Sequence, residues 1–326
     1  MPSTNNPLVE ARQRFDWRSA GLRYYGYSFH LRQLFGFRVQ RVSIDAGFTC
    51  PNVDGTVAVG GCTFCDNRSF SPSRRLPRGG ISQQIDEGIR RLKMRYKCDH
   101  FTAYFQPATN TYAPVDRLRE VYEEAVSHPD VVAMAVGTRA DCVPDNVLDL
   151  LEEMAGRVHL TVEYGMQTMH NKSLDWMNRG EHHDSMLDAV ERSRGRGFDI
   201  CGHIMLGLPG ESHADMMATA DEVARLDLDA VKIHNLYAVN DTPLAEQVRS
   251  GEVELMDRET YICTLLDFLE RLPARMIIER ISGEAPPLYF LGPAWAQDKP
   301  GILRAIDEGF ALRDSFQGKN CRTPNY

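Results

Sequence analysis

The 326-residue sequence lacks the long apolar runs that mark membrane-spanning and exported chains. No stretch of about 18 consecutive apolar residues occurs, so no transmembrane helix is predicted. The first residues, MPSTNNPLVEARQRFDW, contain no apolar core of the kind that a signal peptide needs. These two absences predict a cytoplasmic protein that does not enter a membrane.

Linker sequence is also missing. No Ser/Gly-rich tract, low-complexity segment or repeat of fixed period divides the chain. The composition, 43% hydrophobic and 25% charged, excludes a disordered, collagen-like or coiled-coil protein. We therefore predict one α/β domain over residues 41–272, with an N-terminal extension over 1–40 and a C-terminal capping segment over 273–326.

Positive charge is scarce after the first third of the chain. The formal net charge is −8, yet the first 100 residues carry 16 Lys and Arg against 8 Asp and Glu. The remainder carries 21 basic and 37 acidic residues. The first third therefore predicts a basic face that suits a polyanion, and the alternative is a set of solvated arginines on helix surfaces.

Short apolar runs alternate with helical patterns along the chain. The runs span residues 41–44, 101–105, 131–136, 158–163, 200–206 and 230–236. Apolar residues at helical spacing follow at 81–92, 115–125, 147–154, 186–190 and 216–223, with further helices at 261–272 and 302–313. Nearly continuous apolar runs are typical of buried parallel strands. Strand–helix units in series predict an α/β fold, a partial (β/α)6 TIM-like barrel with additions at both ends.

One loop gathers three of the eight cysteines. The segment DAGFTCPNVDGTVAVGGCTFCDNRSF follows the first predicted strand and holds Cys50, Cys62 and Cys65. Three thiolates can hold three irons of a [4Fe–4S] cluster and leave the fourth iron open to a ligand. The alternatives are a zinc site completed by His30 or Asp66, three reduced structural cysteines, or a thioredoxin-like redox pair.

The other five cysteines share no pair spacing, so no second cluster is predicted. Cys201 and Cys263 lie within apolar runs and are expected in the core. Cys142, just past the third strand, is a candidate reactive thiol.

The cysteine block resembles that of the radical S-adenosylmethionine (SAM) superfamily. The commonest signature of that superfamily is Cys-x3-Cys-x2-Cys, whereas here eleven residues separate Cys50 from Cys62. The widened spacing, with IDAGFTCPN before it and GGCTFC within it, resembles the YhcC-like branch. That branch is related to the Elongator catalytic subunit and to oxygen-independent coproporphyrinogen oxidases. The resemblance covers roughly residues 20–310 and implies a [4Fe–4S] cluster held by Cys50, Cys62 and Cys65.

The resemblance also implies SAM contacts at the ends of the second and third strands. Gln106, Thr109 and Asn110 stand where relatives carry a Gly-Gly-Glu-like segment that faces the SAM amino group. This chain lacks those glycines, and plain turn chemistry is the alternative for all three residues. Thr138 and Arg139 resemble a Thr-Arg-Pro-Asp segment of Elongator-like relatives. Thr138 is assigned to the cofactor and Arg139 to a substrate anion, or otherwise to a salt bridge with a neighbouring acid.

Further SAM contacts are implied at the fourth and fifth strands. Gln167 and Arg179 resemble residues of the coproporphyrinogen-oxidase group that face the SAM ribose and carboxylate. Glu163, inside an apolar strand, is also assigned to the cofactor, with a buried ion pair as the alternative. His203 and Gly207 belong to HIMLGLPGE, where the resemblance expects the adenine, and a core histidine is the alternative for His203.

The resemblance implies reductive cleavage of SAM to methionine and a 5′-deoxyadenosyl radical that abstracts hydrogen from a substrate. It implies an electron donor such as flavodoxin or ferredoxin, and tRNA bound by the basic first third as a candidate partner. Arg280, in the late segment ERISGEAPP, is expected to hold a substrate anion. The alternative is a non-catalytic iron–sulfur or zinc sensor, or an RNA-binding protein, on the same barrel. Such a protein would need the cysteines but not Gln167 and Arg179.

Overall fold

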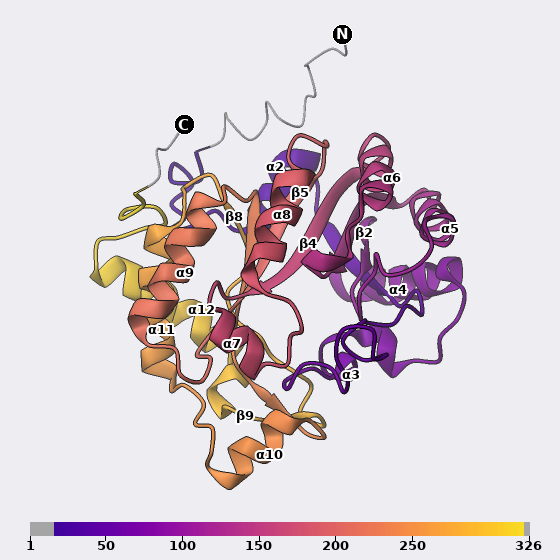
Figure 1. Ribbon diagram of the computed structural model, residues 1–326. Coiled ribbons are helices and arrows are strands. Elements are labelled where there is room, and N and C mark those ends of the chain that lie inside the picture. The colour runs from indigo at the N-terminus through magenta and orange to yellow at the C-terminus, as the bar shows by residue number, and fades with distance from the viewer. Residues whose placement is uncertain (1–15, 323–326) are drawn as a thin grey trace.

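The predicted strands pair side by side, in chain order, within one parallel sheet. A computed structural model of the chain describes residues 16–322. The strands of the main sheet are β1 (Val39–Ile44), β2 (His100–Phe105), β3 (Val131–Thr138), β4 (His159–Gln167), β5 (Asp199–Leu206), β6 (Ala230–Asn235) and β8 (Ile277–Arg280). Each pairs in parallel with the next strand of this order. The sheet curls into an open barrel (Figure 1), which confirms the α/β partial-barrel prediction.

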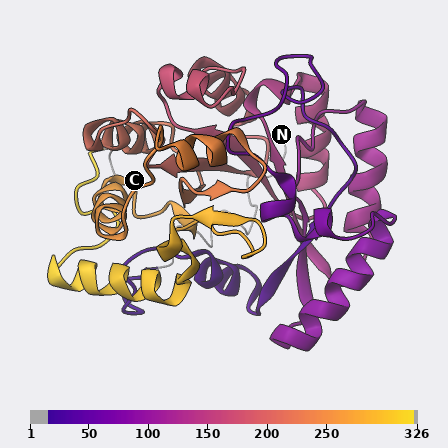
Figure 2. The same ribbon diagram turned by 90° about the horizontal axis from the view of Figure 1, so that it is seen from below.

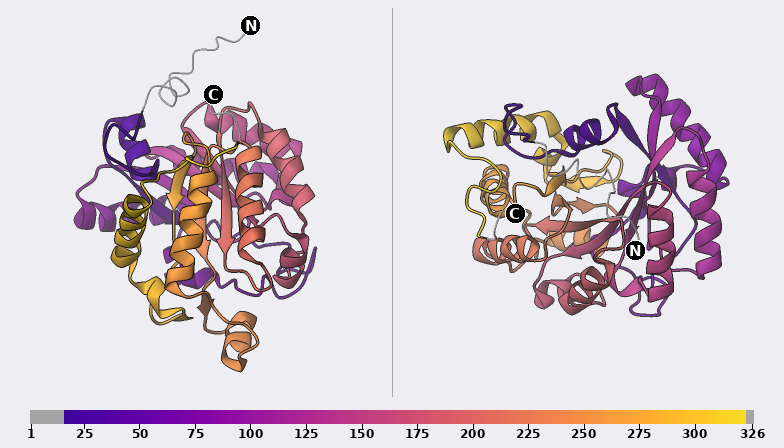
Figure 3. Two further views of the ribbon diagram at one scale, coloured as in Figure 1. Left: turned by 90° about the vertical axis from the view of Figure 1, so that its left-hand side faces the viewer. Right: turned by 90° about the horizontal axis from the view of Figure 1, so that it is seen from above.

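A layer of helices covers the outer face of this sheet (Figures 2 and 3). They are α4 (Ile81–Tyr96), α5 (Val115–Val126), α6 (Asp145–Ala155), α8 (His183–Ser193), α9 (His213–Arg225), α11 (Arg258–Arg271) and α12 (Lys299–Leu312). Their apolar stripes face the sheet: in α4, Ile81, Ile85 and Ile89 are buried, whereas Arg90 and Arg91 are exposed. Helix and strand side chains together form one continuous apolar core.

The helix α2 (Tyr27–Phe35) lies across the seam between the first and last strands. It packs against both β1 and β8, and the backbone of Gly26 bridges that of Ile278. The side chain of Leu31 is buried there. In Figure 1, α2 lies at the opposite end of the barrel from α3 and α7. This helix therefore ties the two edges of the sheet together at the amino ends of the strands.

Short elements collect at the carboxyl ends of the strands. They are the helices α3 (Asn67–Phe70), α7 (Asn171–Trp176) and α10 (Pro243–Ser250), the antiparallel pair β7 (Ala238–Val239) and β9 (Phe290–Gly292), and 3-10 turns at Pro72–Arg75, Ala140–Cys142 and Ala294–Gln297. Figure 2 views the molecule from this end. Loops at this end of a barrel are the ones that carry chemistry.

One strand of the sheet was not expected. Ile277–Arg280 follows the predicted domain boundary at residue 272, yet it pairs in parallel with β6 as a seventh strand. The boundaries at residues 40 and 272 stay predictions. Within residues 16–322, no helix is long and apolar enough to cross a membrane.

Candidate functional site

The cysteine loop follows β1 and places all three of its cysteines at the carboxyl end of the barrel. Cys62 is buried, Cys50 is half-buried, Cys65 is exposed, and none of them forms a disulfide. Gly60 and Gly61 both have positive φ, +87° and +79°, so two successive residues take a conformation that favours glycine. The loop can therefore double back sharply just before the Cys62–Cys65 pair.

The segment after α7 holds this loop in place. The side-chain amide of Asn178 donates to the carbonyl oxygens of Val59 and Gly61, at 3.1 and 2.8 Å. The side chain of Asn52, fully buried, donates to the Cys62 sulfur at 3.4 Å. Hydrogen bonds to cysteine sulfur are one means by which proteins tune a cluster that the sulfur ligates.

Arg179 lies against the same cysteine. Its guanidinium donates to the Cys62 sulfur at 3.8 Å and to the Gly165 carbonyl at 3.0 Å, and it pairs with Glu181 at 2.6 Å. Burial would lower the pKa of Arg179, but the charges of Glu181 and Cys62 outweigh burial and raise it. The Nε atom of Arg179 is buried and has no hydrogen-bond partner within the described chain. Arg179 is therefore a fixed cation beside the cysteines, with one donor still to be satisfied.

The end of β4 is irregular where it meets this arginine. Gln167 has a φ of +64°, an unusual conformation for a residue with a side chain, and the pairing with β5 shifts register before it. A Cβ atom on Gly165 would lie 2.7 Å from Nη2 of Arg179 and 3.0 Å from Nε2 of Gln167. Only glycine leaves both side chains where they are. Strained backbone of this kind clusters at functional sites.

One cavity of about 240 Å³ at the strand ends brings most of the predicted residues together. Those that line it are Cys50, Cys62, Cys65, Gln106, Thr109, Thr138, Arg139, Glu163, Gln167, Arg179, His203 and Arg280. Asn110 and Gly207 do not line it. The cysteines, most of the residues assigned to SAM and both arginines assigned to a substrate anion therefore share one space.

The side chain of Asn110 bonds to the backbone of its own turn and of the neighbouring strand ends. Its amide nitrogen donates to the carbonyl oxygens of Phe105, Pro107 and Gly137, at 3.0, 3.1 and 2.9 Å. This geometry favours turn chemistry, the alternative that the sequence left open. Gly207 has a φ of +87°, and a Cβ atom there would meet the side chain of Met256. The backbone conformation alone therefore accounts for a glycine at this position, and no contact with an adenine is needed to explain it.

Arg139 is engaged within the protein. It forms a two-pronged pair with Asp141, at 2.8 and 2.6 Å, and donates to the carbonyl oxygen of Arg179 at 2.8 Å. Its side chain is only 3% exposed. These contacts favour a structural salt bridge with Asp141 over the substrate role assigned to Arg139. The N–H groups of its guanidinium are already bonded to Asp141 and to the backbone of Arg179, whose position they help to fix.

Glu163 lies at the centre of a buried ion network. Its carboxylate accepts from Arg41 at 3.1 Å, from the Tyr104 hydroxyl at 2.7 Å and from the Lys232 ammonium. His203 Nε2 lies 3.0 Å from the same carboxylate. The carboxylate thus has four partners, which favours the buried ion pair over direct cofactor contact for Glu163.

A second carboxylate completes the charge balance. Glu279, on β8, pairs with Arg41 at 2.7 Å and with Lys232 at 3.4 Å. Arg41, Glu163, Lys232 and Glu279, which we call the buried ion network, carry two charges of each sign. Sequence reasoning missed three of its members, and the charged position Lys232 within a predicted apolar strand was the available signal.

Burial and neighbouring charges shift the pKa values of the groups in and beside this network. Burial would raise the pKa of Glu163, but Lys232 and Arg41 outweigh burial and hold the pKa well below 4.5. Burial, with the nearby charge of Arg41, lowers the pKa of Lys232. Burial also lowers the pKa of His203. His203 is therefore neutral at pH 7 and adds no third positive charge.

Arg280 is the cation that the network does not neutralise. It follows Glu279 on β8 and lines the cavity together with His234 and Tyr237. Burial and the charge of Arg280 hold the pKa of His234 well below its ordinary value, so His234 is neutral. Within residues 16–322, no carboxylate pairs with Arg280, which makes it the clearest candidate for binding an anion.

Comparison with known families identifies this arrangement. The model described as "Radical SAM superfamily" matches residues 56–223, and the "Radical_SAM C-terminal domain" matches residues 228–311. The chain belongs to the radical SAM superfamily. The first match begins between Cys50 and Cys62, the stretch in which this radical SAM chain departs from the commonest cysteine spacing.

Individual relatives agree with this assignment. The chain is 38% identical to the uncharacterized protein YtqA of Bacillus subtilis, over 97% of this chain and 96% of that protein. It is 35% identical to protein YhcC of Escherichia coli, over 82% and 86% of the two chains. The solved structure of Methanocaldococcus infernus Elp3 with an N-terminal deletion is similar in fold, with a TM-score of 0.67 at 16% identity. That likeness covers 86% of this chain and 64% of the Elp3 chain. The predicted YhcC-like relationship is confirmed.

The residues of the cavity fit the cofactors that the radical SAM superfamily implies. Three reduced cysteines from one loop supply three thiolate ligands, and Asn52 and Arg179 supply donors to one of their sulfurs. The unsatisfied Nε of Arg179 suits an anionic ligand beside the cysteines, and the absence of a side chain at Gly165 leaves room for the ends of Arg179 and Gln167 there.

Two other expectations about histidine and cysteine change. His30 lies on α2 at the amino ends of the strands, so it cannot complete a zinc site with the cysteine loop. Asp66, next to Cys65, is held by Arg68 and caps α3. Cys263 was expected in the core and is exposed on α11, whereas Cys201 is buried as predicted.

Proposed function

We propose that this chain is a radical SAM enzyme that cleaves SAM reductively and uses the resulting 5′-deoxyadenosyl radical on a substrate with an anionic group. One observation carries the proposal: the three cysteines, Gln167 and Arg179 with most of the other residues assigned to SAM, and Arg280 line a single cavity. In this proposal, Cys50, Cys62 and Cys65 hold a [4Fe–4S] cluster. When bound, the cluster supplies the electron that breaks the C5′–S bond of SAM.

In this proposal, the protein's own residues bind SAM and orient it. Arg179, with its unsatisfied Nε, would pair with the SAM carboxylate, and Gln167 would bond to the ribose. Gln106, Thr109 and Thr138 are the further cavity residues assigned to SAM. The buried ion network is neutral as a whole, so it fixes the wall of the cavity without attracting a ligand. An electron donor such as flavodoxin or ferredoxin would supply the reducing electron.

The substrate anion is assigned to Arg280. An arginine that meets a phosphate or carboxylate without a competing acid contributes about 1.5–3 kcal/mol. This corresponds to roughly 10- to 100-fold in the dissociation constant. A phosphate of an RNA nucleotide and a small acidic metabolite share this chemistry.

The test begins with the cluster and with SAM cleavage. The protein is reconstituted anaerobically with iron and sulfide, reduced with dithionite in the presence of SAM, and assayed for 5′-deoxyadenosine. We expect about four irons per chain and release of 5′-deoxyadenosine. Replacing Cys50, Cys62 or Cys65 by Ala should abolish both, whereas the exposed Cys263→Ala should change neither. A protein that holds iron but never cleaves SAM would instead be a non-catalytic iron–sulfur sensor.

The anion site is tested separately, with uridine monophosphate and citrate as probes. Arg280→Gln should weaken the binding of at least one probe by about ten-fold or more. Arg280→Lys should restore part of this affinity, since the charge returns without the planar fork. Slow SAM cleavage in the absence of substrate should persist in both variants. Equal probe binding by wild type and Arg280→Gln would contradict the assignment.

A further inference from the structure

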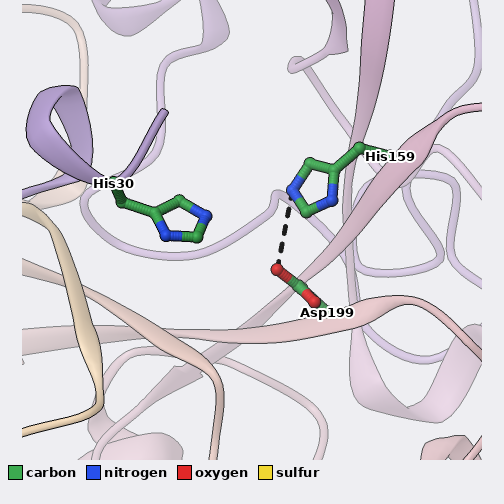
Figure 4. Close-up of side chains that lie close together, drawn as sticks. All are labelled: His30, His159 and Asp199. Carbon is green, nitrogen blue, oxygen red and sulfur yellow. Dashed lines mark ion pairs between the residues drawn. The ribbon is translucent and has the colours of Figure 1, made fainter. Parts of the chain in front are cut away.

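A second group of ligand-type side chains lies at the opposite end of the barrel. His30 from α2, His159 from the start of β4 and Asp199 from the start of β5 turn toward one another (Figure 4). One ligand atom from each lies within 4.8 Å of the other two. His159 Nε2 lies 3.6 Å from a carboxylate oxygen of Asp199. None of the three lines the cavity that holds the cysteines.

The fold brings these residues together from distant parts of the chain. β4 and β5 are neighbouring parallel strands, so their first residues lie at the same edge of the sheet. α2 crosses the seam between β1 and β8 at this edge and directs His30 inward. Both His30 and Asp199 are buried, at 3% and 8% exposure. The fold thus places three side chains of metal-ligating type together at one end of the barrel, and two of them are buried.

We propose that His30, His159 and Asp199 bind a divalent transition-metal ion of the zinc class. Two imidazole nitrogens and one carboxylate oxygen are the donor set that such ions take, with a further position left for another ligand. Ligand atoms around tetrahedral zinc lie roughly 3.3 Å apart, given metal–nitrogen bonds of about 2.0–2.1 Å. Small side-chain rotations would close the present separations to that value.

A neighbouring hydroxyl orients one of the ligands. The Tyr25 hydroxyl lies 3.0 Å from Nδ1 of His30. When Nδ1 donates to this hydroxyl, Nε2 carries the lone pair that a metal requires. The rings of Tyr25 and Tyr27 lie 5.6 and 6.5 Å from the His30 ring, and Phe35 lies 6.0 Å from His159. This aromatic surround limits access by water and strengthens the bonds to an ion.

The bound ion would have a structural role. It would link α2 to β4 and β5, and thereby hold the seam-closing helix against the amino ends of the strands. Metal binding to the folded chain stabilises it by mass action, so zinc should raise the unfolding temperature. The cysteine site lies at the other end of the strands, so the two sites can be tested independently.

The experiment uses the full chain with Cys50, Cys62 and Cys65 replaced by Ala, so that the cysteine loop holds no metal. Folding is checked by circular dichroism, and zinc is titrated against a chromophoric chelator. We expect about one zinc ion per chain. His30→Ala, His159→Ala and Asp199→Asn should each weaken zinc binding by more than about ten-fold, and Tyr25→Phe by about 10- to 100-fold.

A matched pair supplies the control. His182 and Asp175 lie 2.8 Å apart on the surface, closer than His159 and Asp199. His182→Ala and Asp175→Asn should leave zinc affinity and the zinc-dependent rise in unfolding temperature unchanged. A folded, cysteine-free parent chain that binds no zinc would overturn the proposal even if the ligand variants fail to fold. Equal loss in the control variants would overturn it as well.

Discussion

A carboxylate inside a parallel strand has no water to solvate it, and Glu163 is stabilised by protein donors instead. Its side chain is fully buried and its partners come from β1, β2, β5 and β6. Removing one partner of such a group leaves the other charges buried and uncompensated, which costs far more than a surface pair contributes. The network therefore makes the inside of the barrel intolerant of single substitutions.

We predict that Glu163→Gln lowers the free energy of unfolding by about 3–5 kcal/mol at pH 7, because Lys232 loses its nearest carboxylate. Urea unfolding measures this loss. The control is Glu153→Gln, which breaks an ion pair with Arg119 in which both side chains are well exposed. That pair should contribute no more than about 1 kcal/mol. Equal losses in the two variants would contradict the assigned role of Glu163.

We also predict that the effect of Glu163→Gln on the free energy of unfolding depends on pH. The pKa of Glu163 in the folded chain lies well below 4.5. Its ionisation therefore stabilises the fold fully above pH 4.5, and this contribution is lost as the pH falls toward the folded-state pKa. The difference in unfolding free energy between wild type and Glu163→Gln should shrink over that acidic range.

At the scale of elements, apolar patterning was sufficient to predict most of the barrel. All six predicted strands and the predicted helices are present, because nearly continuous apolar runs and helical spacing both reflect burial against the sheet. β8 was missed as a sheet strand because only Met276–Ile278 is apolar before Glu279 and Arg280. Those two charges face other charges and the cavity, a compensation that a linear pattern does not reveal.

The residues of the site likewise fall into those that the sequence could predict and those that it could not. The cysteines could be predicted because they are close in sequence, and Gln167 and Arg179 because a family resemblance indicated them. The buried ion network could not be predicted, because its partners lie in strands far apart in the chain. Cys263 was placed in the core from its apolar neighbours, but in a helix those neighbours point to a different face.

The end of β4 supports a prediction about Gly165. In Gly165→Ala the new methyl group would meet the ends of the Arg179 and Gln167 side chains, which can move without breaking the strand. Iron content should therefore stay at the wild-type level, while SAM affinity, measured by anaerobic titration, should fall by about ten-fold. Gly202→Ala is the control. Its new Cβ would also crowd a side chain, 2.8 Å from Cδ1 of Leu228, but neither residue lines the cavity. Similar SAM affinity in both variants would argue against the assignment of Arg179 and Gln167.

At the scale of the whole molecule, the basic first third has two separate parts. Arg75 and Arg78 are exposed on the loop between the cysteines and α4, near the strand ends. Arg90, Arg91 and Arg95 are exposed on α4, which runs back toward the start of β2. At 1.5 Å per residue, Arg95 lies about 20 Å along the helix from Ile81. A ligand that contacts both parts must be a long polyanion.

If the substrate is a tRNA, both parts should contact its phosphates. Each arginine that neutralises a phosphate adds roughly 0.7–0.9 to the slope of log affinity against log salt concentration. Replacing Arg90, Arg91 and Arg95 by Gln should then reduce that slope by about two to three and weaken tRNA binding in mobility-shift assays. Uncoupled SAM cleavage should not change, because these residues lie on the outer face of the barrel. The control replaces Lys299, Arg304 and Lys319, exposed cations outside the first third, and removes the same charge. Equal weakening by both sets would indicate an effect of net charge alone, and no tRNA shift in wild type would favour a small acidic substrate at Arg280.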